Sequence, residues 1–158
     1  YATLPDRLKK IVLGRTIKHD TAYDTNRNLR RGATEVQDVR LSSGPSHPIV
    51  STHPETGCNS LFLGRRLKHY VNGLPLEESE ALLDELWAHT IQPAHIIEHS
   101  WREGDVVMWD NRCSLHRRGA FAPNAQRELH AAQVRGHKPF EDPDAATRPP
   151  HPRMSPAA

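Results

Sequence analysis

The chain has 158 residues and a formal net charge of +2, which is enough length for one domain with a core. Its basic residues are spread in short pairs, which does not favour a nucleic-acid-binding surface, since such a surface needs clustering on one face. No apolar run approaches the roughly 20 residues of a membrane helix, and two cysteines suit a reducing compartment, so a cytoplasmic protein without membrane partners is expected.

The first predicted element is a packing helix that opens near Pro5 and has one apolar face, formed by Leu8, Ile11 and Val12.

A long polar loop is predicted between His19 and Gly44, because no hydrophobic periodicity survives there. An exposed linker and a lid over a site both fit this composition, and the linker is favoured. Within the loop, residues 38–41 are expected to form a short strand.

A hairpin and a second helix are predicted next. Residues 47–54 are bracketed by prolines, which suit strand ends, and residues 60–63 form the returning strand after a turn at residues 55–57. Residues 76–89 form the clearest helix, with acidic residues in its first turn and an apolar stripe that covers a sheet. The stripe consists of Ala81, Leu82, Leu83, Leu86 and Trp87.

The C-terminal third contains the element around which the chain is expected to be organised. Residues 106–109 are short and apolar, which indicates a buried strand. Asp110 and Asn111 break this strand and are expected to hold the turn by bonding local backbone groups. Residues 113–116 then resume the strand, and residues 128–135 form the last one.

Two polar side chains at the ends of these strands form the candidate site. His116 and Arg127 lie eleven residues apart, with a loop between them. A neutral imidazole suits iron, copper or zinc, and a guanidinium matches a carboxylate through two parallel hydrogen bonds. We therefore expect His116 to bind a metal and Arg127 to anchor an acidic small molecule in one interior cavity.

The order of motifs resembles one known family. Trp109-Asp110-Asn111-Arg112, followed by His116 and Arg127, is similar to the C-terminal segment of the taurine dioxygenase (TauD/TfdA) family. Residues 53–57 and the opening residues 1–20 resemble further stretches of that family in the same order.

The resemblance covers residues 1–139, which are expected to be the C-terminal part of a dioxygenase domain. The family's His-x-Asp iron motif lies upstream of the point where this chain begins, and Tyr1 in place of Met fits a partial sequence. Residues 140–158 are rich in proline and poor in apolar side chains, so a disordered tail is expected.

The resemblance implies a mixed α/β fold that is mainly β, namely part of a double-stranded β-helix (jelly roll) flanked by helices. It implies an iron(II)- and 2-oxoglutarate-dependent dioxygenase that hydroxylates a small, acidic organic substrate with molecular oxygen. In this pattern His116 is an iron ligand, Arg127 binds a carboxylate of 2-oxoglutarate, and no further catalytic residue is expected. Because two of the three iron ligands would be missing, the chain alone is expected to be inactive.

One departure from the family concerns the substrate. The taurine enzyme has a second arginine four residues beyond the first, where this chain has Ala131, so taurine is not the expected substrate. Arg117 and Arg135 lie nearby in sequence, but a solvated position is equally consistent with each. The substrate and any homo-oligomer stay open.

Two other interpretations of the chain stay open. A non-catalytic fragment or binding module would keep the fold without a metal. Alternatively, residues 53–55 spell His-x-Glu, and His53, Glu55 and His116 would form a self-contained metal site if all three reached one point. The family keeps this stretch as a separate element, which favours the dioxygenase interpretation.

Several other chemistry-bearing residues favour structural roles. His95 and His99 are four residues apart, as in zinc motifs, but no third ligand stands near, so core or rim positions are expected. Trp109 is expected to pack under the site. Cys113 lacks a pattern of basic partners, so a nucleophilic role is not expected.

Overall fold

The computed structural model describes residues 1–24, 27–64, 68–120 and 128–145, together with Ala122, Asn124 and Gln126. Arg127 and residues 146–158 of the expected tail lie outside the described residues. In chain order, the elements are α1 (Asp6–Val12), β1 (Thr16–Lys18), the 3-10 turn η1 (Val39–Leu41), β2 (Ser46–Pro48), β3 (Val50–Thr52), β4 (Asn59–Leu61), β5 (Tyr70–Val71), α2 (Leu76–Thr90) and the 3-10 turn η2 (Pro93–His95).

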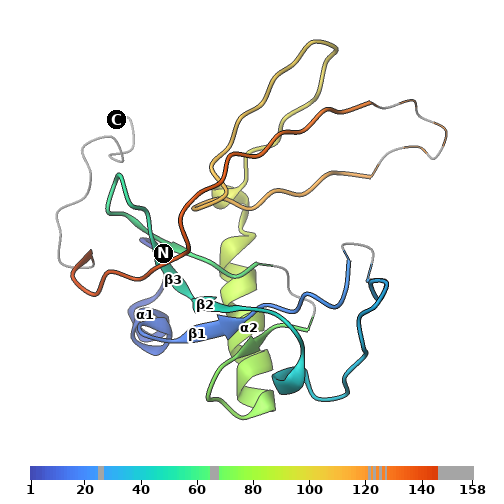
Figure 1. Cartoon of the computed structure of the whole chain (residues 1–158). Helices are drawn as coiled ribbons and strands as arrows, with labels where there is room; N and C mark the ends of the chain where they lie inside the picture. Colours follow the sequence, from blue (N-terminus) through green and yellow to red (C-terminus); the bar gives the residue numbers. More distant parts are fainter. Residues whose placement is uncertain are drawn as a thin grey trace.

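Two small antiparallel sheets lie against the helices (Figure 1). β1 is the central strand of the order β2-β1-β5, and β3 pairs with β4 in the predicted hairpin. The strand predicted at residues 47–54 is divided into β2 and β3, which belong to different sheets. Ile49, the residue between β2 and β3, connects the two sheets: its N–H donates to the Arg15 carbonyl at 2.9 Å, and its carbonyl accepts from the Phe62 N–H at 2.7 Å. The fold is therefore of mixed α and β class with antiparallel pairing.

The two helices bury the apolar faces that their sequence predicts, with three differences. Ile11 of α1 is 39% exposed and Ala81 of α2 is exposed, whereas Ser79 of α2 is buried. The Ser79 hydroxyl accepts the N–H of Val71 in β5 at 2.9 Å, which explains why a polar side chain faces the sheet. The core consists of Leu4, Leu8, Val12, Ile17, Ile49, Val50, Leu63, Val71, Leu82, Leu83 and Leu86.

None of the helices in the described part of the chain has the length and apolar composition that crossing a membrane requires. The longer of the two, α2, spans Leu76–Thr90 and carries Glu77 and Glu78 in its first turn, where acids favour the positive end of the helix dipole.

The two ends of the loop that follows β1 are hydrogen-bonded to each other. The N–H of His19 donates to the Pro45 carbonyl and the N–H of Thr21 donates to the Ser43 carbonyl, both at 2.9 Å. The antiparallel pairing of β1 with β2 thus continues into the loop. Gly44 lies within this ladder with φ of +136°, and a Cβ there would collide with the backbone carbonyl oxygen of His19.

Residues 38–41, predicted as a strand, instead form a 3-10 turn. The Asp38 carboxylate accepts the backbone N–H of Arg40 at 2.9 Å, and this cap competes with extended backbone.

The C-terminal segment, residues 96–139, forms no helix or strand among its described residues. The strands predicted at residues 106–109, 113–116 and 128–135 are therefore wrong for this structure. A strand needs hydrogen-bonded neighbours, and the described residues supply none beside this segment. Figure 1 shows it as long loops, yellow to orange, that extend away from the sheets. Its apolar side chains face solvent: Val106 is 91% exposed, Met108 93% and Val134 99%.

The end of this segment returns to the fold. The N–H of Thr52 donates to the carbonyl of Phe140 at 2.8 Å, and the N–H of Asp142 donates to the Thr52 hydroxyl at 2.9 Å. The N–H of Gly14 lies 3.0 Å from both carboxylate oxygens of Glu141. The first residues of the expected tail are thus held against β3 and the end of α1.

His19 lies among aromatic rings at the base of the loop. Its ring centroid is 5.3 Å from that of His47, 4.9 Å from that of His69 and 5.4 Å from that of Phe62. Its Nε2 atom is buried without a hydrogen-bond partner among the described residues. Burial, followed by the charges of His69 and His47, lowers the pKa of His19 to about 4.

We expect the free energy of unfolding to fall as the pH drops from about 6.5 to about 4. The unfolded chain binds a proton at His19 near the ordinary pKa of about 6.5, whereas the folded chain resists protonation until about 4, so protons favour unfolding in this window. Urea unfolding across this range measures the effect. His19→Phe should reduce the pH dependence, while His137→Phe, at an exposed position, should retain it. An equally steep fall in both variants would contradict this assignment.

Gly44→Ala is expected to destabilise the fold by roughly 2 kcal/mol or more, because the new Cβ meets backbone that cannot rotate away. Gly14→Ala is the matched control: its φ is +71°, but no described atom lies within 4 Å of an added Cβ. That variant should lose only about 1 kcal/mol, the usual cost of a left-handed non-glycine residue. If urea unfolding showed the same loss of stability for both variants, the contact between residue 44 and the His19 carbonyl would not affect the free energy of unfolding.

Candidate functional site

His116, the predicted metal ligand, is exposed and lies on the segment without strands. Its ring centroid is 4.7 Å from that of Trp109, which is itself 44% exposed and accordingly does not pack beneath a buried site. Within the described part of the chain, His116 belongs to no group of three potential metal ligands that lie within 4.8 Å of one another. Since Arg127 lies outside the described residues, a shared cavity for His116 and Arg127 stays a prediction.

The self-contained metal site of His53, Glu55 and His116 is not assembled in the described structure. Their ligand atoms do not gather within 4.8 Å of one another. Glu55 Oε2 lies 3.7 Å from Nε2 of His53, so His116 is the residue that does not reach the other two. The Glu55 carboxylate also accepts from Nη1 and Nη2 of Arg112 at 2.8 Å and 2.9 Å.

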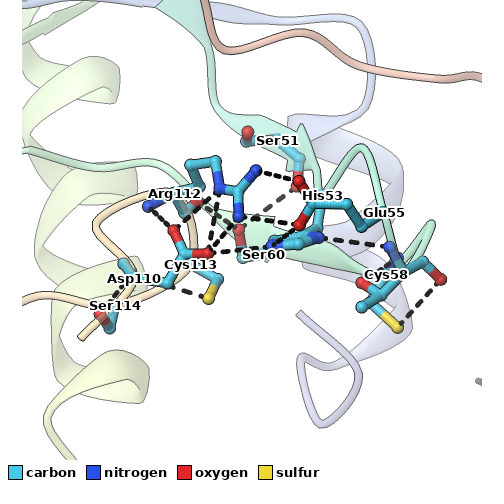
Figure 2. A network of polar contacts seen from close by, with 10 residues as sticks. Ser51, His53, Glu55, Cys58, Ser60, Asp110, Arg112, Cys113 and Ser114 are labelled. Carbon is cyan, nitrogen blue, oxygen red and sulfur yellow. Dashed lines mark hydrogen bonds and ion pairs between the residues drawn. The ribbon is translucent and has the colours of Figure 1, made fainter. Parts of the chain in front are cut away.

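Arg112 joins the β3–β4 turn to the C-terminal segment (Figure 2). Besides Glu55, its guanidinium binds Asp110 in its own turn, with Nε 2.9 Å from Oδ1 and Nη2 2.6 Å from Oδ2. Such forked, charge-assisted pairs fix geometry as well as adding energy. Asp110 and then Glu55 raise the pKa of Arg112, and Arg112 in turn holds the pKa of each carboxyl well below its ordinary range.

His53 completes this network from the end of β3. Its Nδ1 accepts the backbone N–H of Thr56 at 3.3 Å, so in the neutral ring Nε2 carries the proton. Nε2 donates to Oδ2 of Asp110 at 3.1 Å, and the His53 side chain is only 10% exposed. This bond is a further reason, after Arg112, for the lowered pKa of Asp110.

The turn that begins at Asp110 is held by local backbone bonds, as the sequence predicted for this residue. Its Oδ1 accepts the N–H of Arg112 at 2.8 Å, and its carbonyl accepts the N–H groups of Cys113 at 3.3 Å and Ser114 at 3.1 Å. The Ser60 hydroxyl of β4 lies 3.3 Å from the Arg112 carbonyl, so it can donate across the two segments. The turn is therefore fixed both internally and against the hairpin.

Three other residues singled out in the sequence have local partners. Asn111 accepts from the Trp109 indole N–H at 2.9 Å, a side-chain bond and not the expected backbone one. Burial, and then the charge of Asp110, raises the pKa of the Cys113 thiol, which agrees with the expectation that it is no nucleophile. The Cys113 thiol lies 3.7 Å from the Asp110 carbonyl oxygen, so all three residues, Trp109, Asn111 and Cys113, have structural partners nearby.

His95 and His99 do not share a site in the described structure. His95 lies 2.9 Å from the His89 carbonyl through Nδ1 and 3.2 Å from the Thr3 hydroxyl through Nε2. His99 pairs with Asp105 at 3.1 Å. Both residues are exposed and each is bonded to a group of its own surroundings.

The pairing of Arg112 with Glu55 was not predicted from the sequence. A local pattern does, however, predict the bond between Arg112 and Asp110. An Asp-x-Arg pattern occurs at residues 38–40 and at residues 110–112, and in both the arginine N–H and guanidinium bind the preceding carboxylate. The pattern predicts this local turn. It does not predict the second carboxylate, which lies 57 residues away from Arg112 in sequence.

Arg112→Gln is expected to weaken the acid sensitivity of the fold. Because Arg112 lowers the pKa of Asp110 and Glu55, both carboxylates stabilise the fold above their unfolded pKa of about 4 and lose this contribution as the pH falls below it. Without Arg112 the loss of stability between about pH 7 and pH 3 should therefore shrink, as measured by urea unfolding.

Arg40→Gln is the matched control for this prediction, because Arg40 lowers the pKa of one carboxyl, Asp38, within the same kind of turn. Since Arg112 lowers the pKa of two carboxyls and Arg40 lowers the pKa of one, we expect the larger change for Arg112→Gln. An equal or larger change for Arg40→Gln would contradict the cross-linking role of Arg112.

Comparison with known proteins gives consistent matches. The family model described as taurine catabolism dioxygenase TauD, TfdA family matches residues 1–133. The alpha-ketoglutarate-dependent 2,4-dichlorophenoxyacetate dioxygenase of Burkholderia sp. is 37% identical over 140 residues, which are 87% of this chain and 46% of that protein. The (S)-phenoxypropionate/alpha-ketoglutarate-dioxygenase of Sphingobium herbicidovorans is 34% identical over 141 residues, which are 86% of this chain and 49% of that protein.

The fold is also similar to a solved structure. The crystal structure of AAD-2 in complex with Mn(II) and N-oxalylglycine superimposes with a TM-score of 0.57 and 29% identity, over 72% of this chain and 44% of that chain. The chain spans slightly less than half the length of these relatives. Since the family model matches most of the sequence, the chain belongs to the TauD/TfdA family of taurine catabolism dioxygenases.

Proposed function

We propose that this chain contributes the C-terminal part of an iron(II)- and 2-oxoglutarate-dependent dioxygenase. The observation that carries the proposal is the family match over residues 1–133, a range that includes positions 116 and 127. Two relatives named as alpha-ketoglutarate-dependent dioxygenases support it at 37% and 34% identity.

His116 is the proposed iron ligand of this chain. An iron(II) ion held by two histidines and one carboxylate keeps open positions for a chelating cosubstrate and oxygen, and supplies the oxidising chemistry when bound. Among the described residues no two further metal-ligating groups lie within 4.8 Å of His116 and of each other, so they do not by themselves complete an iron site at His116. The proposal assigns the remaining ligands to the part of the family domain that this chain does not match.

Arg127 is the proposed anchor for 2-oxoglutarate. A guanidinium group binds a carboxylate through two parallel hydrogen bonds, and this fixed geometry orients the cosubstrate. The related AAD-2 structure was solved with N-oxalylglycine, a dicarboxylate that differs from 2-oxoglutarate by an N–H in place of a methylene group.

The proposed substrate class is an aryl ether that carries a carboxylate. The names of two relatives specify 2,4-dichlorophenoxyacetate and (S)-phenoxypropionate, which share this chemistry. It agrees with Ala131, since the sulfonate-binding arginine of the taurine enzyme is replaced there. Molecular oxygen is the second reactant, and the free thiols of Cys58 and Cys113 support a cytoplasmic location.

The proposed architecture of the complete domain is a double-stranded β-helix. Residues 106–109 and 128–135 have strand-like composition but lack neighbours among the described residues. We propose that they join the sheet when strands from the rest of the domain pair with them, and that residues 1–139 belong to this one domain while residues 140–158 form a tail.

Succinate release from 2-oxoglutarate tests this function, with the full-length gene product, iron(II) and 2,4-dichlorophenoxyacetate. His116→Ala is expected to lower turnover by at least about 100-fold, since a metal ligand is lost. His130→Ala is the control, because that side chain is 91% exposed and pairs only locally with Glu128. Unchanged turnover in His116→Ala would end the assignment. No succinate release from the unsubstituted protein would favour the rival view of a non-catalytic binding module.

A further inference from the structure

His53, Asp110 and Cys113 bring an imidazole, a carboxylate and a thiol to one place. Their potential ligand atoms all lie within 4.8 Å of one another, and no other such group occurs among the described residues. The three side chains come from two turns that are distant in sequence, and Figure 2 shows Cys113 beside the Asp110 carboxylate. No catalytic role assigned above uses them.

The spacing of these donors suits a small tetrahedral ion. Zinc binds nitrogen and oxygen at roughly 2.0–2.2 Å and sulfur at about 2.3 Å, so its ligand atoms lie roughly 3.3–3.8 Å apart. Nε2 of His53 and Oδ2 of Asp110 are 3.1 Å apart, which is close to this separation. Cys113 is exposed and its thiol makes only a weak bond, 3.7 Å from the Asp110 carbonyl oxygen, so its side chain can rotate toward the other two.

The local charge also favours a cation. Asp110 and Glu55 each carry a negative charge at neutral pH, because the ordinary pKa of a carboxyl, about 4, already lies well below 7. The single positive charge of Arg112 offsets one of them. Glu55 Oε2 lies 3.7 Å from Nε2 of His53, so the remaining negative charge is adjacent to the site. A thiolate at Cys113 would add another.

Binding requires two proton movements. The Nε2 proton that His53 now donates to Asp110 must move to Nδ1, and the hydrogen bond from the Thr56 N–H is then lost. The Cys113 thiol releases its proton to solvent and forms a sulfur–metal bond. One proton therefore leaves for each ion bound, and no oxidation or reduction takes place.

We propose that His53, Asp110 and Cys113 bind a zinc ion, separate from the iron site assigned to His116, with the fourth position open to water. The ion replaces the proton in the His53–Asp110 hydrogen bond and clamps the β3–β4 turn to the turn that precedes His116. The mixed set of one nitrogen, one oxygen and one sulfur donor favours zinc over calcium or magnesium, which take oxygen ligands.

Cobalt(II) titration of the full chain tests this site, because a thiolate bound to Co²⁺ gives a near-ultraviolet charge-transfer absorption. We expect this absorption in the unsubstituted protein and its loss on addition of Zn²⁺. The proposed iron site contains no cysteine, so cobalt bound at His116 does not produce the signal, and failure of one site leaves the other assignment intact.

The two cysteines provide a matched pair of variants. Cys113→Ser should abolish the absorption, Cys58→Ser should retain it, and His53→Gln should weaken cobalt binding by at least about 10-fold. Zn²⁺ should also raise the melting temperature of the unsubstituted protein and of Cys58→Ser, but not that of Cys113→Ser. No sulfur absorption in the unsubstituted protein, its survival in Cys113→Ser, or its loss in Cys58→Ser would each overturn the proposal.

Discussion

The guanidinium of Arg112 is the interaction on which the position of the C-terminal segment depends. Residues 96–139 share no backbone ladder with the sheets in the described structure, so strand pairing does not hold them in place. Arg112 instead pairs with Asp110 in its own turn and with Glu55 in the β3–β4 turn. A single exposed ion pair contributes little to stability, but one cation shared by two carboxylates, with His53 bonded to the same Asp110, forms a network with fixed geometry.

Two attachments of this part of the chain lie at the end of β3. His53 binds the turn at Asp110, and the preceding residue, Thr52, binds the backbone of Phe140 and Asp142. The chain between these points is thus a closed loop whose ends meet on adjacent residues. Closing a loop costs conformational entropy that grows only slowly with the length of the loop. The polar bonds at its two ends can offset this cost even though the loop itself contains no strands. The turn at Asp110 immediately precedes His116, so the same bonds determine where the candidate ligand enters the fold.

Local signals in the sequence were enough to predict the helices and the hairpin. α1 follows from a proline at its start and from apolar spacing, and α2 follows from acidic residues in its first turn and an apolar stripe. The hairpin follows from its turn at residues 55–57. The strand prediction for residues 106–109 failed because an apolar pattern reports a tendency to be buried and carries no information about the partner. The bond between Arg112 and Glu55 joins residues 57 positions apart, beyond the reach of any local pattern. His116 and Arg127 came from family resemblance, which carries such long-range information.

The failed strand predictions and the absence of further metal ligands around His116 among the described residues have one physical cause. Val106, Met108 and Val134 are at least 91% exposed, and burying a side chain of this kind stabilises a fold by roughly 1.5–3 kcal/mol. On the proposed architecture, further strands of the domain cover these side chains. A metal ligand also needs a rigid element to hold it within about 0.5 Å of its working position, which an unpaired segment does not provide for His116. On the proposed architecture, pairing of these strands and assembly of the iron site are therefore the same event, whereas the Arg112 network forms within this chain alone.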